Sequence, residues 1–159
     1  MNIGMDKKFE LLRKIAHEFN QAGITWALGA SMFLYLKGIS PEFDDIDLMI
    51  ADKDIESAKE ILMNMGELLS AKSNYGYATK AFYEFAIDGI EVDFMAGFAV
   101  LKDGIRHDCS LEADPALEVY ELEGEKVPFQ SLEAWCRYYE WMGRDGKVRM
   151  IREKSKVDG

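Results

Sequence analysis

Apolar residues recur at helical spacing in two stretches of the chain. The first runs from about Asp6 to Ala22, and the second from about Lys53 to Met65. The second is followed by Gly66, a residue type that often ends helices. Each stretch has one continuous apolar face, so both predict amphipathic helices that pack against a core.

Short apolar runs rich in β-branched and aromatic residues predict strands between and after these helices. The clearest pair surrounds Asp88-Gly89, a dipeptide typical of two-residue hairpin turns. The expected strands are Ile24 to Leu28, Asp45 to Ile50, Tyr83 to Ile87 and Ile90 to Phe94. Helices and strands together predict an α/β (α+β) fold, a mixed β-sheet backed by helices.

The remaining segments fit the same architecture. A loop is expected from Ser73 to Gly76, a turn at Lys102-Asp103-Gly104 and a strand from Leu117 to Leu122, with a turn at Glu123-Gly124. Ser131 is expected to cap a helix. The sequence shows no repeat or linker, so residues 1–159 are predicted to form a single domain with a short helical C-terminal region from about residue 130.

Composition is ordinary for a globular protein, with 48% hydrophobic and 30% charged residues among 159. No apolar run approaches the about 20 residues that cross a membrane, so we expect a cytoplasmic protein without a membrane partner. The net charge of −10 argues against a duplex-binding surface. Basic residues concentrate only between Arg144 and Lys156, which is either a solvated helix face or a means of steering a triphosphate.

Two carboxylates interrupt the strand from Asp45 to Ile50, although Asp is depleted from strands. Because side chains alternate along a strand, Asp45 and Asp47 project to one side and Ile46, Leu48 and Ile50 to the other. Neighbouring carboxylates repel each other unless a cation lies between them. Hard oxygen donors suit Mg²⁺, which takes its remaining ligands from water and phosphates. The pair therefore predicts a metal site that binds a nucleotide.

Glycine and serine residues stand at the junction between the first strand and the apolar helix from Ser31 to Leu36. Gly29 lets the backbone approach a ligand closely, and a helix N-terminus attracts phosphate. Ser31 is either a helix cap or a phosphate donor. Strand-to-helix turns also use such residues for structural reasons alone, so this motif is weak evidence by itself.

The predicted hairpin has an acidic face. Its two-residue loop pairs Glu84 with Asp93 and Ala86 with Glu91, and like charges opposite each other are destabilising. This face is therefore either solvated or bound to a cation. Asp93 is the candidate for a third metal ligand, whereas Glu84 and Glu91 are interpreted as edge or solvent-facing residues.

These motifs together resemble the nucleotidyltransferase superfamily related to DNA polymerase β, especially small bacterial lincosamide, aminoglycoside and toxin-type members. The resemblance rests on a Gly-x-Ser element that opens a helix, an Asp-x-Asp strand and a later Asp: Gly29, Ser31, Asp45, Asp47 and Asp93. A vaguer similarity extends from Val127 to Arg144. Ala30 replaces the commoner second glycine, and Tyr139 stands where many relatives have a lysine in the C-terminal helix.

The resemblance implies a transferase that uses Mg²⁺ or Mn²⁺ to move a nucleoside monophosphate from an NTP such as ATP to a hydroxyl group. Asp45, Asp47 and Asp93 would hold metal, and Asp93 would also help to deprotonate the acceptor. Gly29 and Ser31 would bind the β- and γ-phosphates.

The lack of a long basic stripe favours a small molecule or protein hydroxyl as acceptor over nucleic acid. Two alternatives remain: a catalytically silent nucleotidyltransferase-fold binding or antitoxin-like protein, and a domain whose carboxylates are structural.

Overall fold

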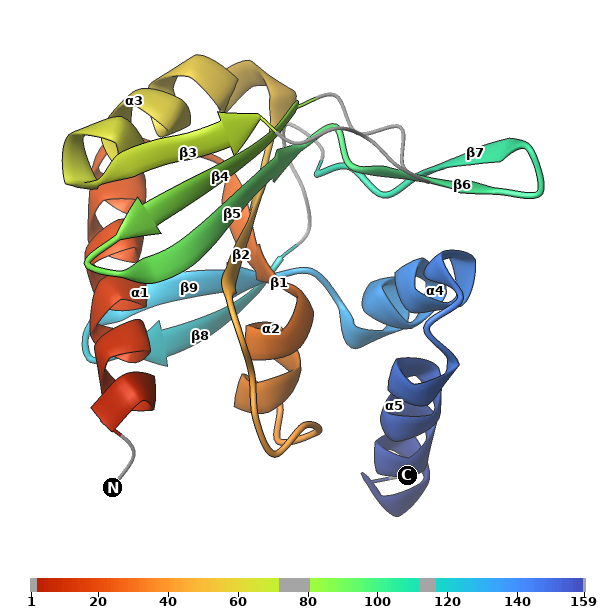
Figure 1. Cartoon of the computed structure of the whole chain (residues 1–159). Coiled ribbons are helices and arrows are strands. Elements are labelled where there is room, and N and C mark those ends of the chain that lie inside the picture. Colours follow the sequence, from red (N-terminus) through yellow and green to blue (C-terminus); the bar gives the residue numbers. More distant parts are fainter. Residues whose placement is uncertain (1–2, 72–80, 112–116, 159) are drawn as a thin grey trace.

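A seven-stranded mixed sheet forms the centre of the computed structural model, which describes residues 3–71, 81–111 and 117–158 (Figure 1). The strands are β1 (Trp26–Gly29), β2 (Ile46–Ile50), β3 (Glu67–Ala71), β4 (Ala81–Ile87), β5 (Ile90–Ala96), β6 (Ala99–Lys102), β7 (Ile105–Asp108), β8 (Glu118–Leu122) and β9 (Glu125–Phe129). The helices are α1 (Ile3–Gln21), α2 (Ala30–Leu36), α3 (Ile55–Met65), α4 (Leu132–Met142) and α5 (Asp145–Asp158), and the 3-10 turn η1 (Asp52–Asp54) precedes α3. The expected mixed sheet backed by helices is confirmed.

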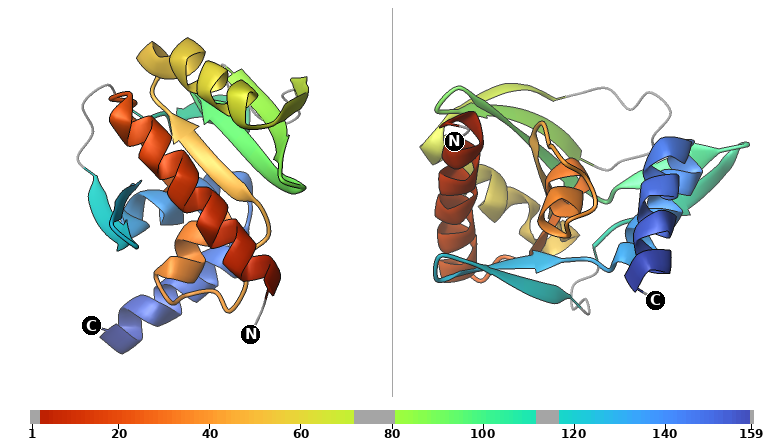
Figure 2. Two further views of the ribbon diagram at one scale, coloured as in Figure 1. Left: turned by 90° about the vertical axis from the view of Figure 1, so that its left-hand side faces the viewer. Right: turned by 90° about the horizontal axis from the view of Figure 1, so that it is seen from below.

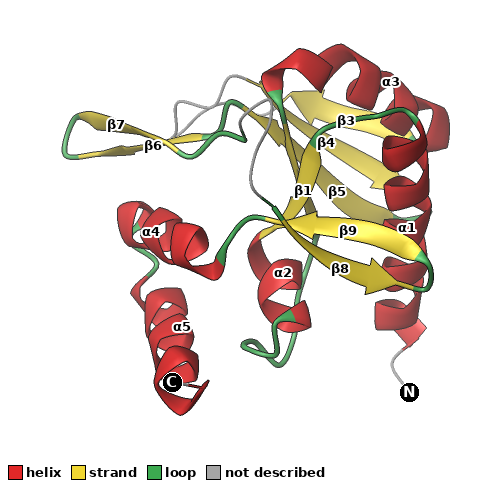
Figure 3. Cartoon of the chain, turned by 180° about the vertical axis from the view of Figure 1, so that it is seen from behind, coloured by secondary structure: helices red, strands yellow, loops and turns green. Residues whose placement is uncertain are grey.

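The strand order in the sheet is β3-β4-β5-β2-β1-β9-β8. Strand β2 pairs parallel with β5, β1 pairs parallel with β9, and the other neighbours are antiparallel. Strands β6 and β7 form a separate hairpin. Figure 3 shows β9 and β8 continuing the sheet beyond β1. This order places β2 directly beside β5, although the two strands are far apart in the sequence. It therefore brings the carboxylates of the two strands close together.

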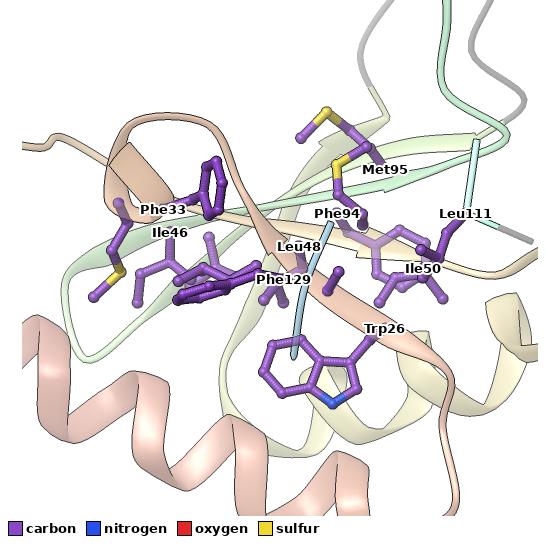
Figure 4. Close-up of a cluster of buried hydrophobic side chains, with 14 of the residues drawn as sticks. Trp26, Phe33, Ile46, Leu48, Ile50, Phe94, Met95, Leu111 and Phe129 are labelled. Atoms are coloured by element: carbon purple, nitrogen blue, oxygen red, sulfur yellow. The ribbon is translucent and has the colours of Figure 1, made fainter. Parts of the chain in front are cut away.

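Helices α1 and α3 lie together on one side of the molecule, and α4 with α5 lies on the opposite side from α1 (Figure 2). The core between these layers contains apolar side chains from strands and helices. Figure 4 shows Phe33 of α2 near Phe129 of β9, and their rings make an edge contact with centroids 5.1 Å apart. Ile46, Leu48 and Ile50 of β2 are buried, as the alternation predicts. The opposite face of β2 carries Asp47 and the buried Met49, whereas Asp45, which was expected to belong to the strand, lies in a bend just before it.

The hairpin between β4 and β5 has the predicted register. Glu84 pairs with Asp93 and Ala86 with Glu91, and the turn residues Asp88 and Gly89 adopt φ angles of 53° and 78°. Such left-handed angles suit an Asp-Gly turn. The acidic residues Glu84, Glu91 and Asp93 therefore share one face of this hairpin, as expected.

The expected C-terminal helix and the turns before it are also confirmed. Ser131 caps α4, because its hydroxyl accepts a hydrogen bond from the backbone N–H of Ala134 at 3.0 Å. Gly66 ends α3, but its backbone is extended rather than left-handed, and a side chain there would collide with the carbonyl oxygen of Ala86. The loop expected from Ser73 to Gly76 lies outside the described residues.

Strands β3 and β9 were not expected from the sequence. The β9 residues pair with β1 through Leu28 and Phe129 and complete the sheet on that side. Among the described residues, none of the helices is both long enough and apolar enough to span a membrane.

Candidate active site

The register of four adjacent strands aligns the residues that the sequence singles out. Gly29 of β1 pairs with Asp47 of β2, Asp47 pairs with Asp93 of β5, and Asp93 pairs with Glu84 of β4. These four residues form one row across the sheet. Residues in such a row lie about 5 Å apart from strand to strand. The sheet thus aligns the strand-to-helix turn at Gly29 with three carboxylates, those of Asp47, Asp93 and Glu84.

Three carboxylates converge beside this row. Asp45, Glu91 and Asp93 each offer an oxygen atom, and these oxygens all lie within 4.8 Å of one another. Asp93 is buried, with 7% of its surface exposed, and the other two are half-buried. Asp47 does not belong to this trio, but together with Asp45 and Asp93 it lines a neighbouring cleft that is described below. The structure therefore brings Glu91, which the sequence suggests is an edge residue, into the acidic cluster.

The donor set of this cluster suits a divalent cation. Carboxylate oxygens are the ligands that Mg²⁺ and Mn²⁺ accept, and oxygens on opposite sides of a bound Mg²⁺ ion lie about 4.2 Å apart. Oxygens within 4.8 Å of one another approach that spacing. Asp45, Glu91 and Asp93 therefore form a set of donors that suits a divalent cation.

The electrostatics of Asp45 reflect the crowding of carboxylates. The pKa of Asp45 is raised from 3.8 to about 6, mainly by burial and then by a hydrogen bond to Glu91 and repulsion from Glu91 and Asp44, while Lys8 partly opposes the shift. Without a cation, the Asp45 carboxyl therefore holds a proton more tightly than an isolated aspartate does. A bound cation would favour its ionised form.

Two members of this cluster, Asp45 and Asp93, line a cleft of about 390 Å³ together with Asp47. Arg144 and Lys147, at the junction of α4 and α5, supply positive charge to the same cleft. The remaining lining is mainly apolar and aromatic and comprises Phe82, Met95, Phe98, Trp135, Tyr139 and Met142, with Ser31 and Asp44. A cleft with acidic and basic walls fits a ligand that is anionic and bound to a cation, such as a metal-bound phosphate chain.

Ser31 and Gly29 occupy the first turn at this cleft. Ser31 lines the cleft, and its hydroxyl accepts a hydrogen bond from the backbone N–H of Asp44 at 3.3 Å. It makes no cap on α2, whose N-cap residue is Gly29. A Cβ atom on Gly29 would lie 2.6 Å from Cζ2 of Trp135. Gly29 is therefore required, in this structure, by the close approach of an indole ring.

Several cleft residues were not identified as functional from the sequence. Arg144 and Lys147 lie in the basic segment that the sequence left open between a solvated helix face and a means of steering a triphosphate, and the sequence pattern assigned no ligand contact to Trp135 or Tyr139. The positions of these side chains depend on how α4 and α5 pack against the sheet. Two features of the sequence could have identified these residues: the concentration of basic residues after Arg144, and Tyr139 at a position where many similar proteins have a lysine.

The sheet order and the placement of the carboxylates define the nucleotidyltransferase fold, and solved structures confirm this at the level of the whole chain. A candidate nucleotidyltransferase from Thermotoga maritima is 25% identical, with a TM-score of 0.74 over 96% of this chain and 94% of that chain.

Two structures of ANT(2'')-Ia share the fold at 16% identity and a TM-score of 0.60. One is a complex with adenylyl-2''-tobramycin and covers 95% of this chain and 94% of that chain. The other is a solution structure of this antibiotic-resistance factor and covers 96% of this chain and 86% of that chain. No protein-family profile matches the sequence, and no curated protein matches it.

Proposed function

We propose that this protein is a nucleotidyltransferase that uses Mg²⁺ or Mn²⁺ to move a nucleoside monophosphate from an NTP to a hydroxyl group. The observation behind this proposal is a single cleft lined both by the carboxylates Asp45, Asp47 and Asp93 and by the basic side chains of Arg144 and Lys147. Carboxylates that hold a cation and side chains that bind phosphate are the two requirements for binding a metal–NTP complex.

In the proposed reaction, the acceptor hydroxyl attacks the α-phosphorus of the NTP. A new P–O bond forms to the acceptor, and the bond to pyrophosphate breaks. When bound, the divalent ion neutralises charge on the phosphates and orients them for in-line displacement. Asp93, which is buried at the centre of the residue row, is the proposed acceptor of the hydroxyl proton.

The roles of the other residues follow from their places in the cleft. Asp45 and Asp47 are proposed metal ligands together with Asp93, and the proximity of Glu91 supports adding it to this set. Gly29 and Ser31 are proposed to bind the β- and γ-phosphates at the start of α2.

The proposed acceptor is a hydroxyl group of a small molecule or a protein. ANT(2'')-Ia has been captured with an adenylylated aminoglycoside, which is a precedent for a small acceptor on this fold. The net charge of −10 also opposes the binding of long nucleic acids.

The test uses NTPs labelled at the α-phosphate, with Mg²⁺ and cell extract as the source of acceptors. We expect label to move into a new species with release of an equal amount of pyrophosphate, and Asp47→Asn to abolish the transfer. If the protein binds Mg²⁺–NTP but transfers no label, the silent binding protein is the correct alternative. If nucleotide binding does not depend on a divalent ion, the carboxylates have a structural role instead.

A further inference from the structure

Two aromatic residues of α4 bring hydrogen-bond donors to the cleft. Trp135 and Tyr139 are four residues apart, so they share one face of the helix. Both line the cleft, and only 2% and 4% of their surfaces are exposed. Among the described residues, neither the Trp135 indole N–H nor the Tyr139 hydroxyl has a hydrogen-bond partner. Buried polar groups are nearly always paired, so these two donors indicate a ligand that accepts hydrogen bonds.

The Trp135 donor lies beside the first turn of α2. The ring atom Cζ2 would be 2.6 Å from a Cβ atom on Gly29, and in an indole this atom is two bonds from Nε1. The ring itself is flanked by Phe33, Tyr138 and Tyr139, with centroids 6.2, 5.2 and 5.5 Å away. Since other aromatic side chains surround the ring, its N–H edge is better suited than its faces to contact a ligand.

The Tyr139 donor shares the cleft with charges of opposite sign, those of Asp47 and Arg144. Burial is the main factor that raises the pKa of Tyr139, the Asp47 carboxylate raises it further, and the Arg144 guanidinium lowers it. The hydroxyl therefore stays protonated at neutral pH and can donate a hydrogen bond. Asp47 is a proposed metal ligand and Arg144 is a cation, so an anionic phosphate oxygen is the type of ligand atom that suits the cleft near both.

We propose that the Tyr139 hydroxyl and the Trp135 indole N–H donate hydrogen bonds to phosphate oxygens of the bound NTP. This inference rests on the proposed function. Phosphate oxygens only accept hydrogen bonds, and both side-chain groups are donors here. Trp135 lies beside Gly29, and Tyr139 lines the same cleft as Ser31 and Arg144, residues proposed to bind or attract the phosphate chain.

The neighbouring Tyr138 supplies a matched control on the same helix. Its hydroxyl accepts a hydrogen bond from Nε2 of Gln130 at 3.0 Å, and it is not among the residues that line the cleft. Tyr138→Phe and Tyr139→Phe therefore delete the same atom, once from a protein hydrogen bond and once from the proposed ligand contact.

The experiment measures the affinity of each variant for ATP and for tripolyphosphate, both with Mg²⁺, by calorimetry, and its melting temperature without ligand. We expect Tyr139→Phe to bind both ligands about tenfold more weakly, because a hydrogen bond to a charged group is lost. Its melting temperature should be equal to wild type or higher, since an unpaired buried hydroxyl is removed. Tyr138→Phe should show the opposite pattern, with a lower melting temperature and unchanged affinities.

Each other outcome is informative. If wild type and Tyr139→Phe bind both ligands equally well, the inference is wrong while the proposed function stands. A loss of affinity for ATP but not for tripolyphosphate would mean that the hydroxyl contacts ribose or base, which also overturns it. If wild type binds neither ligand, the proposed function itself fails. Trp135→Phe should weaken both ligands as well, and unchanged affinity would remove Trp135 from the proposal.

Discussion

Replacing Asp45 by asparagine should stabilise the metal-free protein at neutral pH and have little effect at pH 4. The folded protein raises the pKa of Asp45 from 3.8 to about 6, mainly through burial and then through Glu91. The folded state holds this proton more tightly than the unfolded chain does. The contribution of the Asp45 carboxyl to the free energy of unfolding is therefore fully present below about pH 4 and is lost as the pH rises through 6. Asparagine cannot ionise, so the variant escapes this loss.

The magnitude follows from the size of the shift. A change from 3.8 to about 6 would correspond to about 3 kcal/mol for a fully buried group. Asp45 is only half-buried, and solvent screening reduces the effect to about 1 kcal/mol. For a chain of this size, that difference changes the melting temperature by about 2–4 °C.

The assay is urea unfolding of wild type and Asp45→Asn at pH 4 and pH 7.5, with EDTA. The free energy of unfolding should favour the variant by about 1 kcal/mol more at pH 7.5 than at pH 4. Asp103→Asn is the control, because Asp103 lies in the exposed β6–β7 turn, far from the acidic cluster in sequence, at a φ angle of 53° that asparagine tolerates. An equal effect of Asp45→Asn at both pH values would refute the argument that crowded carboxylates raise this pKa.

Three further predictions test other parts of the molecule. ATP should raise the melting temperature only with Mg²⁺ or Mn²⁺ present, and equal shifts in EDTA would contradict a shared site. Gly29→Ala should lower the free energy of unfolding by about 1–3 kcal/mol, because its Cβ would meet Trp135, whereas Gly146→Ala, which has open space, should not destabilise the protein. Labelled RNA and DNA should bind weakly at physiological salt, and sub-micromolar affinity with a steep salt dependence would show that the acceptor class is wrong.

Local signals in the sequence were sufficient to predict the elements whose structure depends on neighbouring residues, such as the hairpin of β4 and β5. The Asp88-Gly89 turn fixed the register of β4 and β5, since a two-residue loop leaves one pairing that satisfies both strands. Strand β9 was missed because Pro128 interrupts a short, charged segment, and proline argues against a strand. Its Val127 and Phe129 are nevertheless buried, so packing against the core decided its structure.

The acidic site could be predicted as a set of candidates but not as a geometry. Alternation along β2 placed Asp47 on the side opposite Ile46 and Leu48, as the sequence indicated. Asp45 lies in a bend just before the strand, so alternation along β2 does not determine its position. Which carboxylates converge depends on the parallel pairing of β2 with β5, a long-range contact with no local signal. That pairing brings Glu91 beside Asp45 and so changes the composition of the cluster.

The close contact between Gly29 and Trp135 links the two walls of the cleft. Gly29 lies in the strand row that holds Asp47, and Trp135 belongs to α4, the helix that leads directly to Arg144. A larger residue than glycine would hold the indole ring farther from the sheet and would move the basic wall away from the acidic one. The same glycine that resembles a phosphate-binding element in the sequence thus also permits the close approach of α4 to the sheet through Trp135. This packing role explains why glycine is needed there even before any ligand binds.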